Sequence, residues 1–113
     1  MEDKKRDISD STRQIILELQ QNEITEQSIY LNLAKRVKKQ SEREILERIG
    51  NEEGMHSDIW SKYTNKRLAP QKFKVFIYTL LSIIFGYTFA IKVMEKGEKD
   101  SQEMYSKLAL EVP

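Results

Sequence analysis

With 113 residues, the chain is long enough for one domain and a single hydrophobic core. Its net charge of +1 gives no reason to expect nucleic acid as a partner, and the absence of cysteine excludes a disulfide scaffold, a zinc ribbon and thiol catalysis. Glycine and proline number only 4 and 2, and long stretches consist of Glu, Lys, Leu, Ile, Gln and Arg, which are good or fair helix formers. These features together predict an all-α fold.

The N-terminal segment, residues 1–11, contains no apolar run of the kind that directs secretion. We therefore expect a flexible N-terminus over 1–11, followed by one helical domain over 12–113. The expected location is cytoplasmic, either as a separate protein or as the cytosolic domain of a membrane protein.

A first helix is predicted to begin somewhere from Ser9 to Thr12, because all four of these residues are of N-cap type. It should run to about Lys39, because apolar side chains recur at helical spacing from Ile16 as far as Val37. Glu23 falls on this apolar stripe, which is an unusual position for a carboxylate.

A second helix is predicted to begin at Ser41, because Glu44 follows three residues later in the capping-box pattern. We expect it to fade over residues 63–67. Its expected apolar face consists of Ile45, Ile49, His56 and Trp60, with Glu53 between them. Gly50 and Gly54 lie inside this helix, where they either permit the close approach of a neighbouring helix or mark a kink.

The third segment, VFIYTLLSIIFGYTFAI, extends from Val75 to Ile91 and is almost wholly apolar. It either enters a membrane or forms a helix buried in a core and in an interface, and we favour the second interpretation. The helical pattern continues past Lys92 to about Leu110. A helix of about 50 Å is too long for short neighbours to cover, so we predict a homodimer through the segment from Val75 to Ile91.

The stretch NEEGMH contains the single histidine of the chain, His56, with Glu53 three residues before it. On a helix these two positions share a face, so both side chains can bind one ion. Iron, manganese and zinc accept carboxylate and imidazole ligands together. The alternative interpretation is a solvated helix face with an ordinary surface histidine.

Two further features favour a metal site. A buried carboxylate without a partner is costly, and a metal ion is the most economical partner for Glu23 on its apolar stripe. The chain also contains an internal echo, because Glu23 and Glu98 are each followed seven residues later by a tyrosine, Tyr30 and Tyr105, and then by a Leu-Ala pair. Two helices are therefore expected to present the same arrangement of glutamate and tyrosine.

Taken together, Glu23, Tyr30, Glu53 and His56 resemble the pattern of the ferritin-like superfamily, and of rubrerythrin in particular. The stretches NEEGMHSDIW and LLSIIFGYTFAIKVMEKGE are similar to the rubrerythrin-like domain found before membrane iron transporters of the vacuolar type. The resemblance covers about residues 12–110.

This resemblance implies a di-iron site in which Glu23, Glu53, His56 and Glu98 are metal ligands, with Glu95 as the alternative to Glu98. The implied chemistry is oxidation of ferrous iron by oxygen or peroxide, as in a ferroxidase or peroxidase-type oxidoreductase. Iron sensing or delivery linked to iron transport is the other implied role. Manganese or zinc would suit the same ligands.

The resemblance also implies that Tyr30 and Tyr105 orient the ligand carboxylates, with core packing as the alternative role. The family pattern needs a fourth helix with a second Glu-x-x-His, which this sequence does not contain. Either the chain is a fragment that ends before that helix and a downstream membrane iron-transport domain, or the protein does without it. We therefore predict an antiparallel, ferritin-like bundle of three helices, completed by a second copy.

Two other functions compete with iron binding. One is a metal-free helical module that dimerises through its apolar third segment, since a large apolar surface usually marks an interaction site. The other is a membrane-anchored helical protein, with the same segment in lipid.

Overall fold

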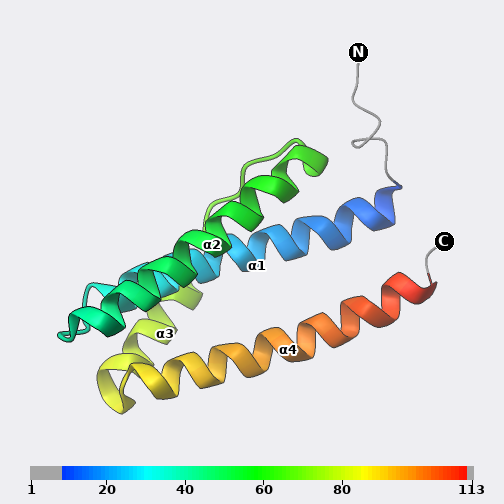
Figure 1. The fold of residues 1–113 in the computed structure, drawn as a ribbon. Helices are drawn as coiled ribbons and strands as arrows, with labels where there is room; N and C mark the ends of the chain where they lie inside the picture. The colour runs from blue at the N-terminus through cyan, green and yellow to red at the C-terminus, as the bar shows by residue number, and fades with distance from the viewer. Residues whose placement is uncertain (1–8, 112–113) are drawn as a thin grey trace.

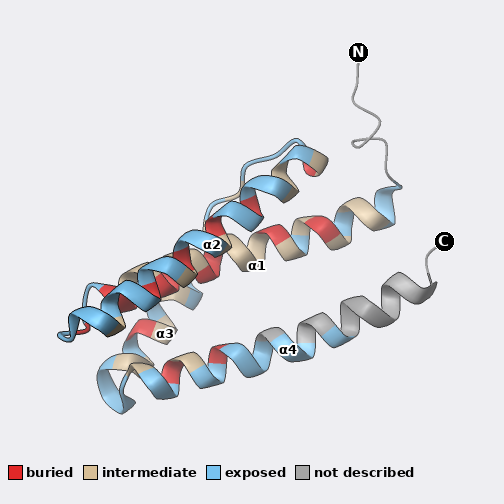
Figure 2. Cartoon of the chain, in the orientation of Figure 1, coloured by how far each residue is buried: buried red, intermediate tan, exposed pale blue. Residues whose placement is uncertain are grey.

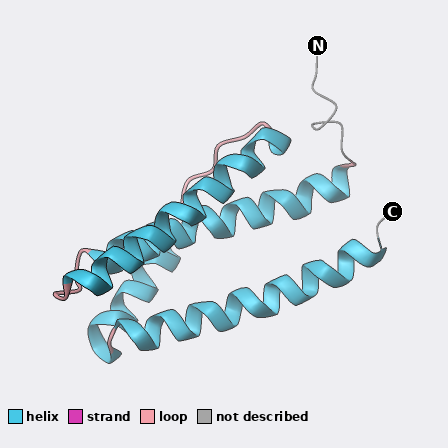
Figure 3. Ribbon diagram, viewed as in Figure 1, coloured by secondary structure: helices cyan, strands magenta, loops and turns pink. Residues whose placement is uncertain are grey.

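A computed structural model describes residues 9–111, apart from the side chains of Glu98, Ser101, Gln102 and residues 104–111. The described part consists of helices joined by loops, with no strand (Figure 3). This confirms the all-α prediction. It contains α1 (Asp10–Ala34), α2 (Gln40–Thr64), α3 (Lys72–Phe85) and α4 (Tyr87–Glu111). Residues 9–111 therefore form four helices where three were expected. The predicted flexible N-terminus falls, over 1–8, outside the described residues.

The helices α1 and α2 form an antiparallel pair, and α3 packs against both α1 and α4 (Figure 1). The helix α4 then runs back along the molecule, with the α3–α4 corner at the same end as the connection between α1 and α2. The side chain of Ser9 accepts a hydrogen bond from the Thr12 amide and caps α1, as the sequence predicts.

The first helix ends at Ala34 and not near Lys39, because the chain turns there. The amides of Arg36 and Val37 both donate to the carbonyl of Leu33, which closes the turn. Val37 leaves the helix but stays buried, at 8% exposure, within the main apolar cluster. We attribute the observed path of the chain to the burial of Val37, which takes precedence over one more helical turn.

The predicted capping box at the start of α2 is wrong. The N-cap is Lys39, two residues before Ser41, and it makes no side-chain cap, so Ser41 already lies inside the helix. The expected end is confirmed: α2 stops at Thr64, and Asn65 follows in the left-handed conformation (φ 58°) that asparagine tolerates at a C-cap.

The single long third helix is also corrected, since the chain breaks at Gly86 into α3 and α4. Gly86 adopts φ 92°, a conformation open to glycine at low cost. Its amide donates to the carbonyl of Ser82 and its carbonyl accepts from Ala90, so one residue ends α3 and begins α4. Within the described residues, no helix is long and apolar enough to cross a membrane.

The hydrophobic core is centred on α1 and includes residues of α2 and of the first turns of α4, with Val75 and Tyr78 of α3 packed against it; Figure 2 marks the buried positions. Its buried members are Ile29, Tyr30, Leu33, Ala34, Val37, Leu46 and Met94. On α2 the buried face differs from the predicted one: Ile45 is 48% exposed, whereas its neighbour Leu46 is buried at 3%. Gly50 and Gly54 lie on that buried face, so small residues rather than large ones mark the contact with α1.

Polar side chains of α1 hold the connection between α2 and α3. Arg13 donates to the main-chain carbonyl of Thr64 over 2.8 Å, Gln20 to that of Lys66 over 2.8 Å, and Gln21 to that of Ala69 over 2.7 Å. The Thr64 hydroxyl in turn donates to the Gln20 amide oxygen, and both residues are 1% exposed. Gln20 and Thr64, although buried, therefore both have hydrogen-bond partners.

Candidate metal centre

Three of the predicted ligands come together between α1 and α2. Glu23 on α1 and Glu53 and His56 on α2 each offer a ligand atom, and these atoms all lie within 4.8 Å of one another. The Nδ1 atom of His56 lies 4.0 Å from Oε1 of Glu23. Two carboxylates and an imidazole at this spacing can converge on a single cation.

The site is buried on one side and open on the other. The Glu23 side chain is 19% exposed and that of His56 is 53% exposed. A cavity of 240 Å³ adjoins the cluster and is lined by Glu23, His56, Ile59 and Trp60. An ion held by the three residues would therefore keep open coordination positions on the solvent side.

One carboxylate oxygen of the cluster suits a cation in particular. Oε2 of Glu53 is buried, and no hydrogen bond reaches it from the described residues. Burial of a carboxylate oxygen without a hydrogen bond costs free energy, which a bound cation would offset. The donor set and this oxygen both fit a metal ion.

The two glycines of α2 bring the ligands into range. A Cβ added at Gly50 would lie 3.1 Å from Cγ of Leu31, and one added at Gly54 would lie 2.7 Å from Cδ of Gln27. Both contacts are with α1, so the close-approach interpretation of the glycines is confirmed. Gly54 adjoins Glu53 in the chain, so one of these close contacts with α1 lies next to the cluster.

The other predicted site residues are placed differently. The side chains of Glu98 and Tyr105 fall outside the described residues, and Glu95, the alternative ligand on α4, is exposed. Tyr30 is 5% exposed and belongs to the hydrophobic core. Core packing is therefore established for Tyr30, whereas its predicted role beside a metal stays a prediction.

Sequence reasoning missed Glu26, which is 7% exposed and lies one turn after Glu23. It lines a separate cavity of 270 Å³ between α1, α3 and α4, together with Lys74, Tyr78 and Met94. The signal was available, because Glu26 precedes the buried Ile29 by three residues and so shares its face.

Burial raises the pKa of Tyr78 above its ordinary value of 10.0, and the negative charge of Glu26 raises it further. The neutral phenol therefore stabilises the folded chain at pH values below the ordinary pKa of tyrosine. This stabilisation is lost as the pH rises through the higher folded-state pKa. We expect the free energy of unfolding to fall as the pH rises above the ordinary tyrosine pKa of 10.0, and to fall less steeply in Tyr78→Phe. Chemical denaturation at a series of alkaline pH values measures the slope.

Tyr63→Phe, which removes a phenol outside this cavity, is the control for that experiment. An equally steep fall in the wild type and in Tyr78→Phe would contradict the assignment to Tyr78. Deprotonation of lysines affects the wild type and Tyr78→Phe alike, so the difference between their two stability curves reports on Tyr78.

Comparison of the chain with protein-family models, with curated proteins and with solved structures finds no match. The assignment of function therefore rests on the geometry of the site itself.

Proposed function

We propose that this chain binds ferrous iron through Glu23, Glu53 and His56, as a ferritin-like iron-binding domain. The observation that carries the proposal is the convergence of these three ligand atoms within 4.8 Å, from two helices. The buried Glu53 oxygen without a hydrogen bond from the described residues supports it.

The ligand set and the open face both suit iron. Mixed carboxylate and imidazole ligation suits iron, manganese and zinc, whereas magnesium and calcium prefer oxygen ligands alone. Bound ferrous iron would supply redox chemistry toward oxygen or peroxide, which the open side of the site would admit. The residues themselves would hold the ion and fix its position, with Glu98 of α4 as the proposed additional ligand.

Trp60 offers a direct readout, because it lines the same cavity as Glu23 and His56 and is the single tryptophan of the chain. In an anaerobic titration with ferrous iron, we expect saturable quenching of tryptophan fluorescence. Glu53→Gln and His56→Asn should each weaken binding by more than about tenfold. Loss of a group that only hydrogen-bonds to a metal ligand already weakens metal binding by that much.

The matched control is Glu52→Gln, which removes the neighbouring carboxylate from an exposed position outside the cluster. Elemental analysis after removal of free metal gives the stoichiometry independently of fluorescence. Equal iron binding by the Glu52→Gln and Glu53→Gln variants would refute the site. Negligible iron in the wild type would favour a metal-free helical module instead.

A further inference from the structure

The corner between α3 and α4 presents a cluster of large apolar side chains to solvent. Ile83, Ile84 and Phe85 are 61%, 59% and 61% exposed, and Phe89 on the first turn of α4 is 45% exposed. We call these four residues the apolar tip. A stripe at helical spacing extends it along the outer face of α3 through Leu80, Phe76 and Phe73. Exposed apolar surface on this scale marks an interaction site.

Exposed basic side chains lie beside the apolar tip. They come from the α1–α2 connection, which contributes Arg36, Lys38 and Lys39, and from α4, which contributes Lys92. We call these four residues the basic rim. The α1–α2 connection and the α3–α4 corner meet at a cavity of 500 Å³, whose wall includes Arg36, Lys38 and Lys39 on one side and Ile83 and Tyr87 on the other. One carboxylate, Glu42, also lines it.

The position of the rim is set by buried residues. Val37, between Arg36 and Lys38, is 8% exposed and packs in the core, so its basic neighbours are held at the surface on either side. On α4, the buried Ala90 and Met94 flank Lys92 at 1% and 4% exposure. Figure 1 shows the connection and the corner together at one end of the molecule.

The sequence around the apolar stripe has the same charge bias. Residues 59–94 contain no aspartate or glutamate, although the whole chain has 18 of them. The basic residues in that stretch are Lys62, Lys66, Arg67, Lys72, Lys74 and Lys92. Aromatic and aliphatic side chains on one face of a helix, with lysines but no carboxylate in the same stretch of sequence, are typical of helices that lie in a membrane interface.

We propose that the apolar tip and the basic rim dock this chain onto an anionic membrane surface, with the apolar tip entering the headgroup region. The rim would attract anionic headgroups, and each lysine near such a surface adds to the attraction. A second copy fits less well, because a two-fold contact through this end would bring the rim of one copy toward the rim of the other.

The test is flotation of the chain with two kinds of vesicle, one of phosphatidylcholine alone and one of phosphatidylcholine and phosphatidylglycerol in equal parts. We expect at least about tenfold more bound protein on the anionic vesicles, with binding weakened by added salt. The charge-reversed variant Lys38→Glu/Lys39→Glu should lose this binding. It should still fold, because glutamate is favourable at the start of a helix such as α2.

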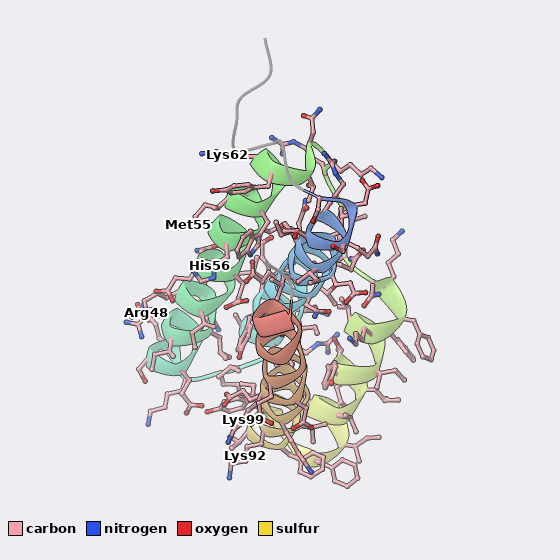
Figure 4. The ribbon with its side chains drawn as sticks, turned by 90° about the vertical axis from the view of Figure 1, so that its right-hand side faces the viewer. Arg48, Met55, His56, Lys62, Lys92 and Lys99 are labelled. Atoms are coloured by element: carbon pink, nitrogen blue, oxygen red, sulfur yellow. The ribbon has the colours of Figure 1, made fainter. Side chains whose placement is uncertain are left out.

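A second variant, Phe85→Ser, removes an exposed apolar side chain without reversing a charge and should also weaken binding. The matched controls are Lys62→Glu/Lys66→Glu for the charges and Met55→Ser, 63% exposed, for the apolar side chain. Figure 4 shows Lys62 at the far end of α2 from Lys92, away from the proposed contact. Circular dichroism verifies that each variant is helical.

Three outcomes would overturn the proposal. The first is equal binding to neutral and anionic vesicles. The second is equal loss of binding in the control variants, which would indicate a nonspecific charge effect. The third is an absence of vesicle binding together with a dimer, by sedimentation, that Phe85→Ser dissociates; a second copy would then be the occupant of this surface.

Discussion

Gly50→Leu is expected to lower the free energy of unfolding by about 3 kcal/mol, since the new side chain must enter the contact between α1 and α2. A Cβ alone would lie 3.1 Å from Cγ of Leu31 and 3.2 Å from Cβ of Tyr30. Tyr30 is 5% exposed and fixed in the core, so it has little room to yield. The remaining atoms of leucine can be accommodated only if the helices separate.

The same separation should weaken iron binding, because α1 carries Glu23 while α2 carries Glu53 and His56. Denaturant unfolding measures the first effect, and the fluorescence titration measures the second on protein that is still folded. Gly97→Ala is the control, because a Cβ there meets no atom within 4 Å. It should raise stability by about 0.5 to 1 kcal/mol through helix propensity alone. Unchanged stability in Gly50→Leu would show that the helices are not in close contact.

Leu33→Ala should lower the free energy of unfolding by about 4 kcal/mol, toward the upper part of the range for a buried leucine. Leu33 is 0% exposed and belongs to the cluster that joins α1, α2 and α4. Removal of its side chain therefore leaves a cavity that neighbours from several helices border, and such a cavity collapses poorly.

Leu80→Ala provides the comparison, since Leu80 lies on α3 and is 39% exposed. Its loss should change stability by about 0.5 kcal/mol or less. Urea unfolding of both variants gives the difference directly. Similar losses of stability at the two positions would mean that Leu80 is buried in solution. Another molecule would then cover the outer face of α3.

Periodicity predicted the helical class and much of α1 and α2, because amphipathic spacing and the Ser9 cap are local properties of the sequence. It failed at Gly86, where the apolar pattern continues through the break and only the backbone conformation reveals the corner. It also placed Ile45 on the buried face of α2, where the two glycines in the contact favour Leu46 instead, although the predicted Ile49 does pack against the core.

The candidate site shows the same division. Glu53 and His56 are three residues apart, so their shared face follows from helix geometry. The proximity of Glu23 depends on how α1 and α2 pack, which the carboxylate on an apolar stripe indicated only indirectly. Glu26 was missed although it lies on a buried face, and iron binding itself stays a prediction.

The hydrogen bonds from α1 to the connection between α2 and α3 have a consequence for sequence divergence. Arg13, Gln20 and Gln21 all donate to main-chain carbonyls, which every amino acid possesses. The path of this connection is therefore encoded largely in α1 and only weakly in its own side chains. Related chains should be free to vary at Lys66 and Ala69, while the three donors on α1 stay under selection.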